Sequence, residues 1–131
     1  MRKQTNLDPD LERIAKIVVD CIFAVHSETG PGLLESIYGK CLAWEINSRG
    51  LKVQRQVVLP IHYRGQRIDD GLRIDLLVED QIIIEVKAVH EMSPIFKTQI
   101  ITYLKLSRLR LGFLVNFNQA LIRDGIERIV L

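Results

Sequence analysis

The sequence of 131 residues is long enough for one domain with an ordinary hydrophobic core, and its 47% hydrophobic and 26% charged residues are typical of a soluble globular protein. No apolar run approaches the roughly 20 residues that span a bilayer, and residues 1–10 lack the apolar stretch of a secretory signal, so we expect a cytoplasmic protein. The net charge of +2 does not by itself mark the chain as a nucleic-acid-binding protein.

The first expected element is a helix that begins at Asp8-Pro9, because Asp is a favoured N-cap and Pro fits the first helical position. Apolar residues then recur at helical spacing, and Gly30 is the expected end. The recurring residues are Leu11, Ile14, Ala15, Val18, Cys21, Ile22 and Val25. We expect residues 1–131 to form a single domain in which residues 1–9 are loosely ordered.

A second helix is expected after Gly30-Pro31-Gly32, ending near Arg49-Gly50, where glycine suits the position after a helix. Its expected apolar stripe is Leu34, Ile37, Tyr38, Cys41 and Leu42. Cys21 and Cys41 fall on the apolar faces of these two helices. Neither cysteine has the close Cys or His companions of a metal site, so we expect reduced core residues.

Residues 52–88 are rich in β-formers and predict a meander of three strands, at about 52–63, 66–78 and 82–88. A third helix should follow Ser93-Pro94, and a short buried strand should occupy residues 111–116. A small strand or helical turn is expected within residues 121–131. The order α-α-β-β-β-α-β predicts an α/β fold with a central mixed sheet flanked by helices.

Three charged residues interrupt the apolar runs of the second and third strands: Asp75, Glu85 and Lys87. A three-residue turn over residues 79–81 matches aliphatic residues across the two strands and puts Asp75 opposite Glu85, whereas a two-residue turn scrambles both faces. Two carboxylates about 5 Å apart repel unless a cation lies between them, and their oxygens suit Mg²⁺. The alternative is a surface strand pair in which Lys87 balances the acids.

Asp75, nine residues and then Glu85-x-Lys87 resemble the PD-(D/E)xK nuclease superfamily, with Ile74 in place of the proline. More narrowly, Gly32-Leu-Leu-Glu35-Ser-Ile-Tyr38 matches the signature of the GxxExxY family, which is grouped with these nucleases. The resemblance covers nearly the whole chain and implies a restriction-endonuclease-like core.

The resemblance also implies roles for the residues that match. It makes Asp75 and Glu85 ligands of Mg²⁺ (or Mn²⁺), with the Val86 carbonyl as a further ligand, and Lys87 would act at the attacking water or the scissile phosphate. In many relatives an acid of the first core helix joins the metal shell, which implies this role for Glu35. The alternative for Glu35 is an acid favoured by the positive N-terminus of its helix.

Three further residues are candidates for positioning the substrate. Tyr38 is expected to pack in the core with its hydroxyl toward the site. Gln99 and Tyr103 fit a QxxxY pattern that lies beside the active site in RecB-like relatives and shares one helical face. The alternative for this pair is the ordinary edge of an amphipathic helix.

These features predict a Mg²⁺-dependent nuclease of low sequence specificity, with DNA favoured over RNA. Residues 49–73 and 97–110 each carry a local charge of +4 that can contact phosphates, although solvated faces are the alternative. Two rivals are a non-catalytic nucleic-acid- or protein-binding module derived from the nuclease fold, and an enzyme that acts on other phosphate esters. A homodimer is expected by analogy with other small nucleases.

Overall fold

The computed structural model describes residues 6–131. Of the residues 1–9 expected to be loosely ordered, the first five lie outside the described residues, whereas Asp8 and Pro9 already cap and begin a helix. The elements are α1 (Pro9–Thr29), α2 (Glu35–Ser48), β1 (Val53–Tyr63), β2 (Gln66–Val78), β3 (Ile82–Lys87), α3 (Pro94–Ser107), β4 (Leu111–Asn116), the 3-10 helix η1 (Ile122–Gly125) and β5 (Ile126–Val130). The expected order is confirmed, and β5 adds a fifth strand. No helix within residues 6–131 is long and apolar enough to cross a membrane.

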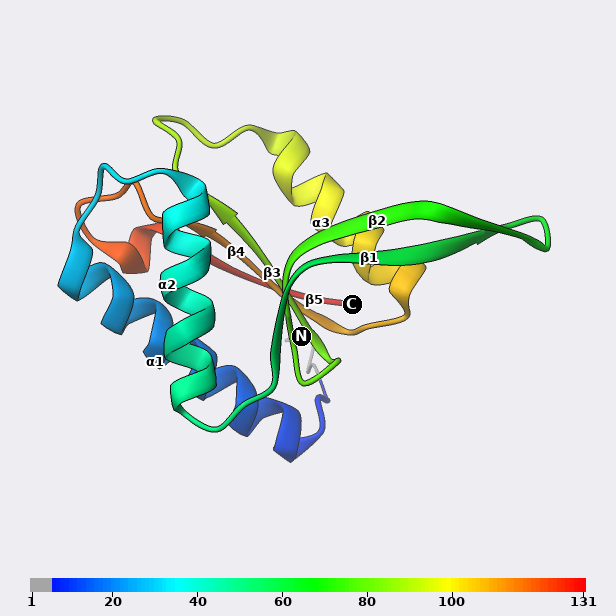
Figure 1. The fold of residues 1–131 in the computed structure, drawn as a ribbon, viewed down its shortest axis with the longest axis horizontal. Helices are drawn as coiled ribbons and strands as arrows, with labels where there is room; N and C mark the ends of the chain where they lie inside the picture. Colours follow the sequence, from blue (N-terminus) through cyan, green and yellow to red (C-terminus); the bar gives the residue numbers. More distant parts are fainter. Residues whose placement is uncertain (1–5) are drawn as a thin grey trace, which may run out of the picture.

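The five strands form one sheet in the order β1-β2-β3-β4-β5. β3 and β4 are parallel because α3 carries the chain back between them, and the other three pairs are antiparallel. Helices cover both faces of the sheet, with α1 and α2 on one side and α3 on the other (Figure 1). The expected α/β fold, a mixed sheet flanked by helices in a restriction-endonuclease-like arrangement, is confirmed.

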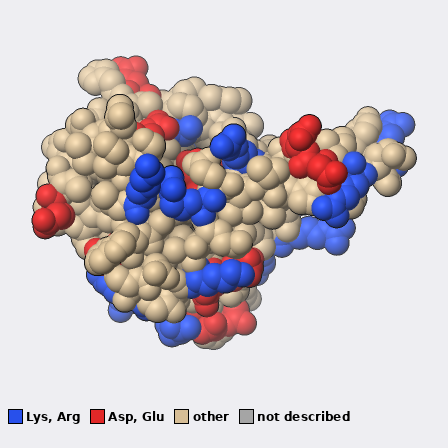
Figure 2. Space-filling model, in the orientation of Figure 1, with Lys and Arg blue, Asp and Glu red and all other residues tan. Residues whose placement is uncertain are grey.

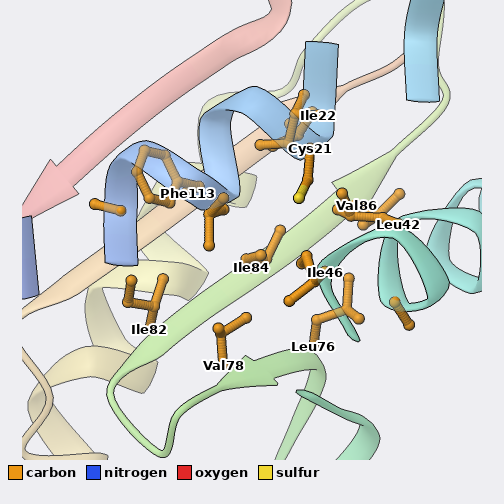
Figure 3. Packing of buried hydrophobic residues seen from close by; sticks show 14 of the residues in the cluster. Cys21, Ile22, Leu42, Ile46, Leu76, Val78, Ile82, Ile84, Val86 and Phe113 are labelled. Carbon is orange, nitrogen blue, oxygen red and sulfur yellow. The ribbon is translucent and has the colours of Figure 1, made fainter. Parts of the chain in front are cut away.

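α1 has the expected start, end and buried face. The side chain of Asp8 accepts a hydrogen bond from the backbone N–H of Asp10, and the helix ends at Gly30. Every residue of the expected apolar stripe is buried. Figure 3 shows Cys21 and Ile22 from this helix over alternate residues of β3. Burial raises the pKa of the Cys21 thiol to about 11, so this core thiol stays protonated at neutral pH.

The apolar stripe expected on α2 is only partly correct. Tyr38, Leu42 and Ile46 are fully buried at four-residue spacing, but Leu34 is 70% exposed and Ile37 is 40% exposed. Leu34 lies before the helix with an extended backbone, so helical periodicity does not govern its direction. Ile37 is about 100° around the helix from Tyr38 and so points away from the buried face.

α3 covers the opposite face of the sheet. Ser93 caps it by accepting a hydrogen bond from the N–H of Ile95, and Arg108 ends it in the left-handed conformation. Ile100 and Leu104 are buried against the sheet. The core residues around them are Leu72, Ile74, Leu77, Ile83, Leu114 and Ile129.

β1 and β2 extend beyond the body of the molecule as a twisted two-stranded arm (Figure 1), defined here as residues 57–74. Its tip is Arg64-Gly65, whose φ values of 49° and 78° suit a two-residue hairpin turn. The pairing register shifts after Leu59, where a Cβ on Gly71 would collide with the Leu59 carbonyl. Figure 2 shows Lys and Arg side chains at the tip of the arm and Asp and Glu side chains part of the way along it.

Candidate functional site

β2 stops pairing with β3 where the charged residues begin. The three pairs are Leu76↔Ile84, Leu77↔Ile83 and Val78↔Ile82. They confirm the predicted three-residue turn and the predicted register for these pairs, but the ladder ends before the expected pairing of Asp75 with Glu85. One step further, Oδ2 of Asp75 accepts a hydrogen bond from the N–H of Val86 at 2.9 Å. A side chain therefore replaces the backbone carbonyl that a continued ladder would have offered to this donor.

β1 has an irregularity at the same level. Gln56 has a φ of 53°, and the pairing of β1 with β2 has a gap at Gln56 and Asp75. Leu76 belongs to the core under α1 and α2, whereas Ile74 belongs to the core under α3. Residues two apart in a regular strand share one face, so β2 twists sharply at Asp75. The arm leaves the sheet at this twist.

A cavity of about 260 Å³ lies at the twist. Its lining residues are Glu35, Ser36 and Gly39 of α2, Arg55 and Gln56 of β1, Asp75 of β2 and Val86 of β3. The first turn of α2 reaches the end of β3, where Oε1 of Glu35 accepts a hydrogen bond from the N–H of Ala88 at 3.2 Å. The cavity thus brings two of the predicted acids together with the start of α2.

Glu85 is buried in the sheet beside Asp75, with only 5% of its surface exposed. Its Oε1 atom has no hydrogen-bond partner among residues 6–131. Burial and the neighbouring Asp75 carboxylate raise the pKa of Glu85 to about 9, and Lys87 opposes this rise. A buried oxygen without a protein partner is costly, so an ordered water or a bound cation is needed at this position.

The two acids fit a divalent cation that retains much of its water. A cation between the carboxylates would be the missing partner of the Glu85 oxygen and would remove the repulsion from Asp75. No group of three His, Cys, Asp or Glu side chains within residues 6–131 is arranged to hold a metal ion. Mg²⁺ is commonly bound through only one or two protein carboxylates, so the pair is sufficient for it.

Lys87 lies two residues after Glu85 and turns toward α3. Its Nζ atom is 4.2 Å from the centroid of the Phe96 ring, which is the geometry of a cation–π contact. On the same helix, Nε2 of Gln99 donates a hydrogen bond to the Tyr103 hydroxyl at 3.1 Å. Gln99 and Tyr103 therefore share one face as predicted, but neither they nor Lys87 line the cavity.

Tyr38 is fully buried and stacks on Phe117, with 4.5 Å between the ring centroids. Its hydroxyl, which the sequence leads us to expect at the site, instead binds the loop before α2. It donates a hydrogen bond to the Gly30 carbonyl at 2.6 Å and accepts one from the N–H of Leu33 at 3.1 Å. Tyr38 thus fixes the loop that delivers Glu35, and it does not line the cavity.

Sequence reasoning did not assign Arg55, Gln56 or Asn116 to the site, although Arg55 belongs to the basic stretch 49–73 that was expected to contact phosphates. Asn116 is fully buried at the end of β4, beside Lys87 in the parallel pairing. Its side chain accepts a hydrogen bond from the N–H of Val89 at 3.1 Å and donates one to the Val89 carbonyl at 3.0 Å. An asparagine at the end of an apolar strand could have marked this position in the sequence, because a buried amide requires hydrogen-bond partners. No sequence signal marks the left-handed backbone of Gln56.

Comparison with known proteins points in the same direction as this geometry. Residues 12–129, which run from α1 into β5, match a family model described as the PD-(D/E)XK nuclease superfamily. The comparisons with curated proteins and with solved structures found no match.

Proposed function

Because the chain belongs to the PD-(D/E)XK nuclease superfamily, we propose that it hydrolyses phosphodiester bonds of nucleic acid with Mg²⁺ or Mn²⁺, preferring DNA to RNA and with low sequence specificity. The observation that carries this proposal is the buried acid pair, in which Asp75 accepts a hydrogen bond from Val86 and an oxygen of Glu85 has no partner among residues 6–131. Within the superfamily we assign the chain to the GxxExxY family, on residues 32–38.

In this proposal Asp75, Glu85 and the Val86 carbonyl hold the metal ion. When bound, the ion supplies Lewis-acid assistance to phosphodiester hydrolysis. Glu35, on the α2 wall of the cavity, orients water through the carboxylate oxygen that the Ala88 N–H leaves free. The backbone N–H groups of Val86 and Ala88 hold the carboxylates of Asp75 and Glu35, so these oxygens are positioned before the substrate arrives.

Lys87 provides a positive charge beside the acid pair. Its ammonium group donates hydrogen bonds to the attacking water or to the scissile phosphate, where negative charge develops during the reaction. Phe96 holds the ammonium on the α3 side of the sheet. Gln99 and Tyr103 lie further along the same helix and are proposed to position the substrate strand.

The test is a cleavage assay on single- and double-stranded DNA and RNA, with Mg²⁺ or Mn²⁺ and with Glu85→Gln purified in parallel. The variant keeps the volume of the side chain but loses its charge, so it should fold and fail to cleave. The expected result is cleavage of DNA that requires the metal and is absent in the variant. A folded protein that neither cleaves nor binds metal in calorimetry would overturn the proposal in favour of a non-catalytic binding module.

Two further parts of the proposal concern the setting in which the protein acts. Cys21 and Cys41 are free thiols, which fits a reducing compartment, and we place the protein in the cytoplasm. A homodimer stays a prediction, and light scattering on the purified chain would test it. If metal binds but no nucleic acid is cleaved, another phosphate ester becomes the favoured substrate.

A further inference from the structure

The cavity at the twist of β2 has a basic side chain that the proposed metal chemistry does not use. Arg55 of β1 lines the cavity together with Asp75 and Glu35. Within residues 6–131 its guanidinium nevertheless makes no salt bridge, although two carboxylates share the cavity. A guanidinium that is exposed and has not paired with nearby acids is available to a ligand.

The backbone beside Arg55 is held in place across the hairpin. Gln56 adopts a φ of 53°, which is uncommon for a residue other than glycine and needs support from its surroundings. Beside it, Nε of Arg73 in β2 donates a hydrogen bond to Oε1 of Gln56 at 3.0 Å. The position of Arg55 is set by its pairing with Leu76 of β2, next to this contact.

The other cations of the arm and of the proposed catalytic residues lie outside the cavity. Arg67 pairs with Asp69 at 2.6 Å, and Arg64 lies over the Tyr63 ring at the tip of the arm. Lys87 is held on the α3 side by Phe96 and does not line the cavity. Among the residues that the structure describes, Arg55 is therefore the cationic side chain of this cavity.

We infer that Arg55 binds a phosphate of the nucleic-acid backbone in this cavity, an inference that rests on the proposed function. A planar guanidinium matches two phosphate oxygens and forms the stronger, charge-assisted kind of hydrogen bond. The cavity of about 260 Å³ is below the usual size of small-molecule sites, about 300 Å³ and above. A phosphodiester group fits in this volume, and in this inference the rest of the strand lies outside.

This placement makes the two walls of the cavity complementary. On one side of the cavity Asp75 binds the metal ion, and on the other side Arg55 neutralises a phosphate that the acids would otherwise repel. Arg55 makes no base-edge contact in this arrangement, so the interaction does not depend on sequence. It identifies the substrate by its backbone charge.

The inference is tested by binding of fluorescently labelled DNA, measured by anisotropy on the full chain. All variants carry Glu85→Gln so that the DNA is not cut. Arg55→Ala should weaken binding by about tenfold, the loss expected for one charge-assisted contact, and should lower the salt dependence by about one phosphate contact. Arg55→Lys should restore part of the affinity. Arg64→Ala, at the arm tip, removes the same charge and should change affinity less than Arg55→Ala.

The unfolding temperature of Arg55→Ala serves as the folding control and should match that of its parent, because the side chain is exposed and makes no salt bridge within residues 6–131. Equal DNA affinity for Arg55→Ala and its parent would overturn the inference, as would an equal loss for Arg64→Ala. Cleavage by the chain with Glu85 intact is measured separately. An Arg55 effect without any cleavage would leave the phosphate contact standing and remove the proposed function. Cleavage by the chain, with no effect of Arg55→Ala on DNA binding, would support the proposed function and overturn the phosphate contact of Arg55.

Discussion

The carboxylate of Asp75 is a hydrogen-bond partner of the Val86 backbone, with 2.9 Å between Oδ2 and the amide nitrogen. The bond joins β2 to β3 just beyond their last backbone pair, where β2 twists away. Asp75 therefore has two functions that are usually separate. It is a proposed metal ligand, and it satisfies a backbone donor at the break in the sheet.

Substitutions of Asp75 should separate these two functions. Asp75→Ala and Asp75→Asn both remove the charge and should both weaken metal binding, but only the amide can still accept the hydrogen bond from Val86. The free energy of unfolding should therefore be about 1–3 kcal/mol lower for the alanine variant than for the asparagine variant. Urea unfolding without metal measures the difference. Equal stability of the two variants would show that the hydrogen bond does not support the fold.

The raised pKa of Glu85 predicts how stability depends on pH without metal. The pKa is about 9 in the folded chain, against an ordinary value of 4.5. Below pH 4.5 both states are protonated, and the contribution of this group to stability is fully present. Between pH 4.5 and about 9 the unfolded chain loses the proton while the folded chain keeps it, so the free energy of unfolding falls as the pH rises.

Glu85→Gln isolates this effect, because glutamine cannot titrate and all other groups remain. Urea unfolding of both proteins from pH 5 to 8.5, with a chelator present, should show a steeper decline for the unsubstituted chain. At pH 8 the variant should be the more stable protein. Parallel curves would mean that Glu85 ionises normally and that the acid pair is not held together as described.

The fold could be predicted from the sequence where local signals agreed with one another. Asp8-Pro9 and Ser93-Pro94 both cap helices as predicted, because the capping side chain and the proline act within one turn. The register of β2 with β3 followed from aliphatic matching such as Leu76 with Ile84, since a slip of one residue would have reversed both faces.

The site was predictable only in its acids, because its other features depend on tertiary geometry. The left-handed conformation of Gln56 has no local cause, so neither the twist nor the place of Arg55 in the cavity followed from the sequence. The hydroxyl of Tyr38 binds Gly30, eight residues earlier, through a loop that has no periodic pattern. The predicted apolar stripe of α2 wrongly included Leu34, because helical periodicity applies only from Glu35, where the helix begins.

Removal of the Tyr38 hydroxyl should affect stability rather than chemistry. Tyr38→Phe keeps the stack on Phe117 but leaves the N–H of Leu33 and the Gly30 carbonyl without their partner. We expect a loss of about 1–2 kcal/mol in the free energy of unfolding. Tyr103→Phe is the matched control, because that hydroxyl belongs to an exposed hydrogen bond, and it should change stability by less than about 0.5 kcal/mol. Unchanged stability with reduced metal affinity in Tyr38→Phe would place this hydroxyl at the site after all.

Lys87 should be required for cleavage but not for holding the metal. Lys87→Ala removes a positive charge close to Glu85, so calorimetry should show metal affinity that is unchanged or slightly higher while cleavage is abolished. Phe96→Leu keeps the lysine but removes the aromatic face under its ammonium group, and should lower kcat by less than Lys87→Ala does. If Lys87→Ala instead unfolds, or loses metal affinity together with cleavage, the lysine is a structural counter-charge for the acid pair. Lys87→Arg separates these cases, because it keeps the positive charge beside Glu85 but changes the geometry of the hydrogen-bond donor. It should be as stable as the unsubstituted chain under either role. Its cleavage activity should stay low if Lys87 acts on the phosphate or the water.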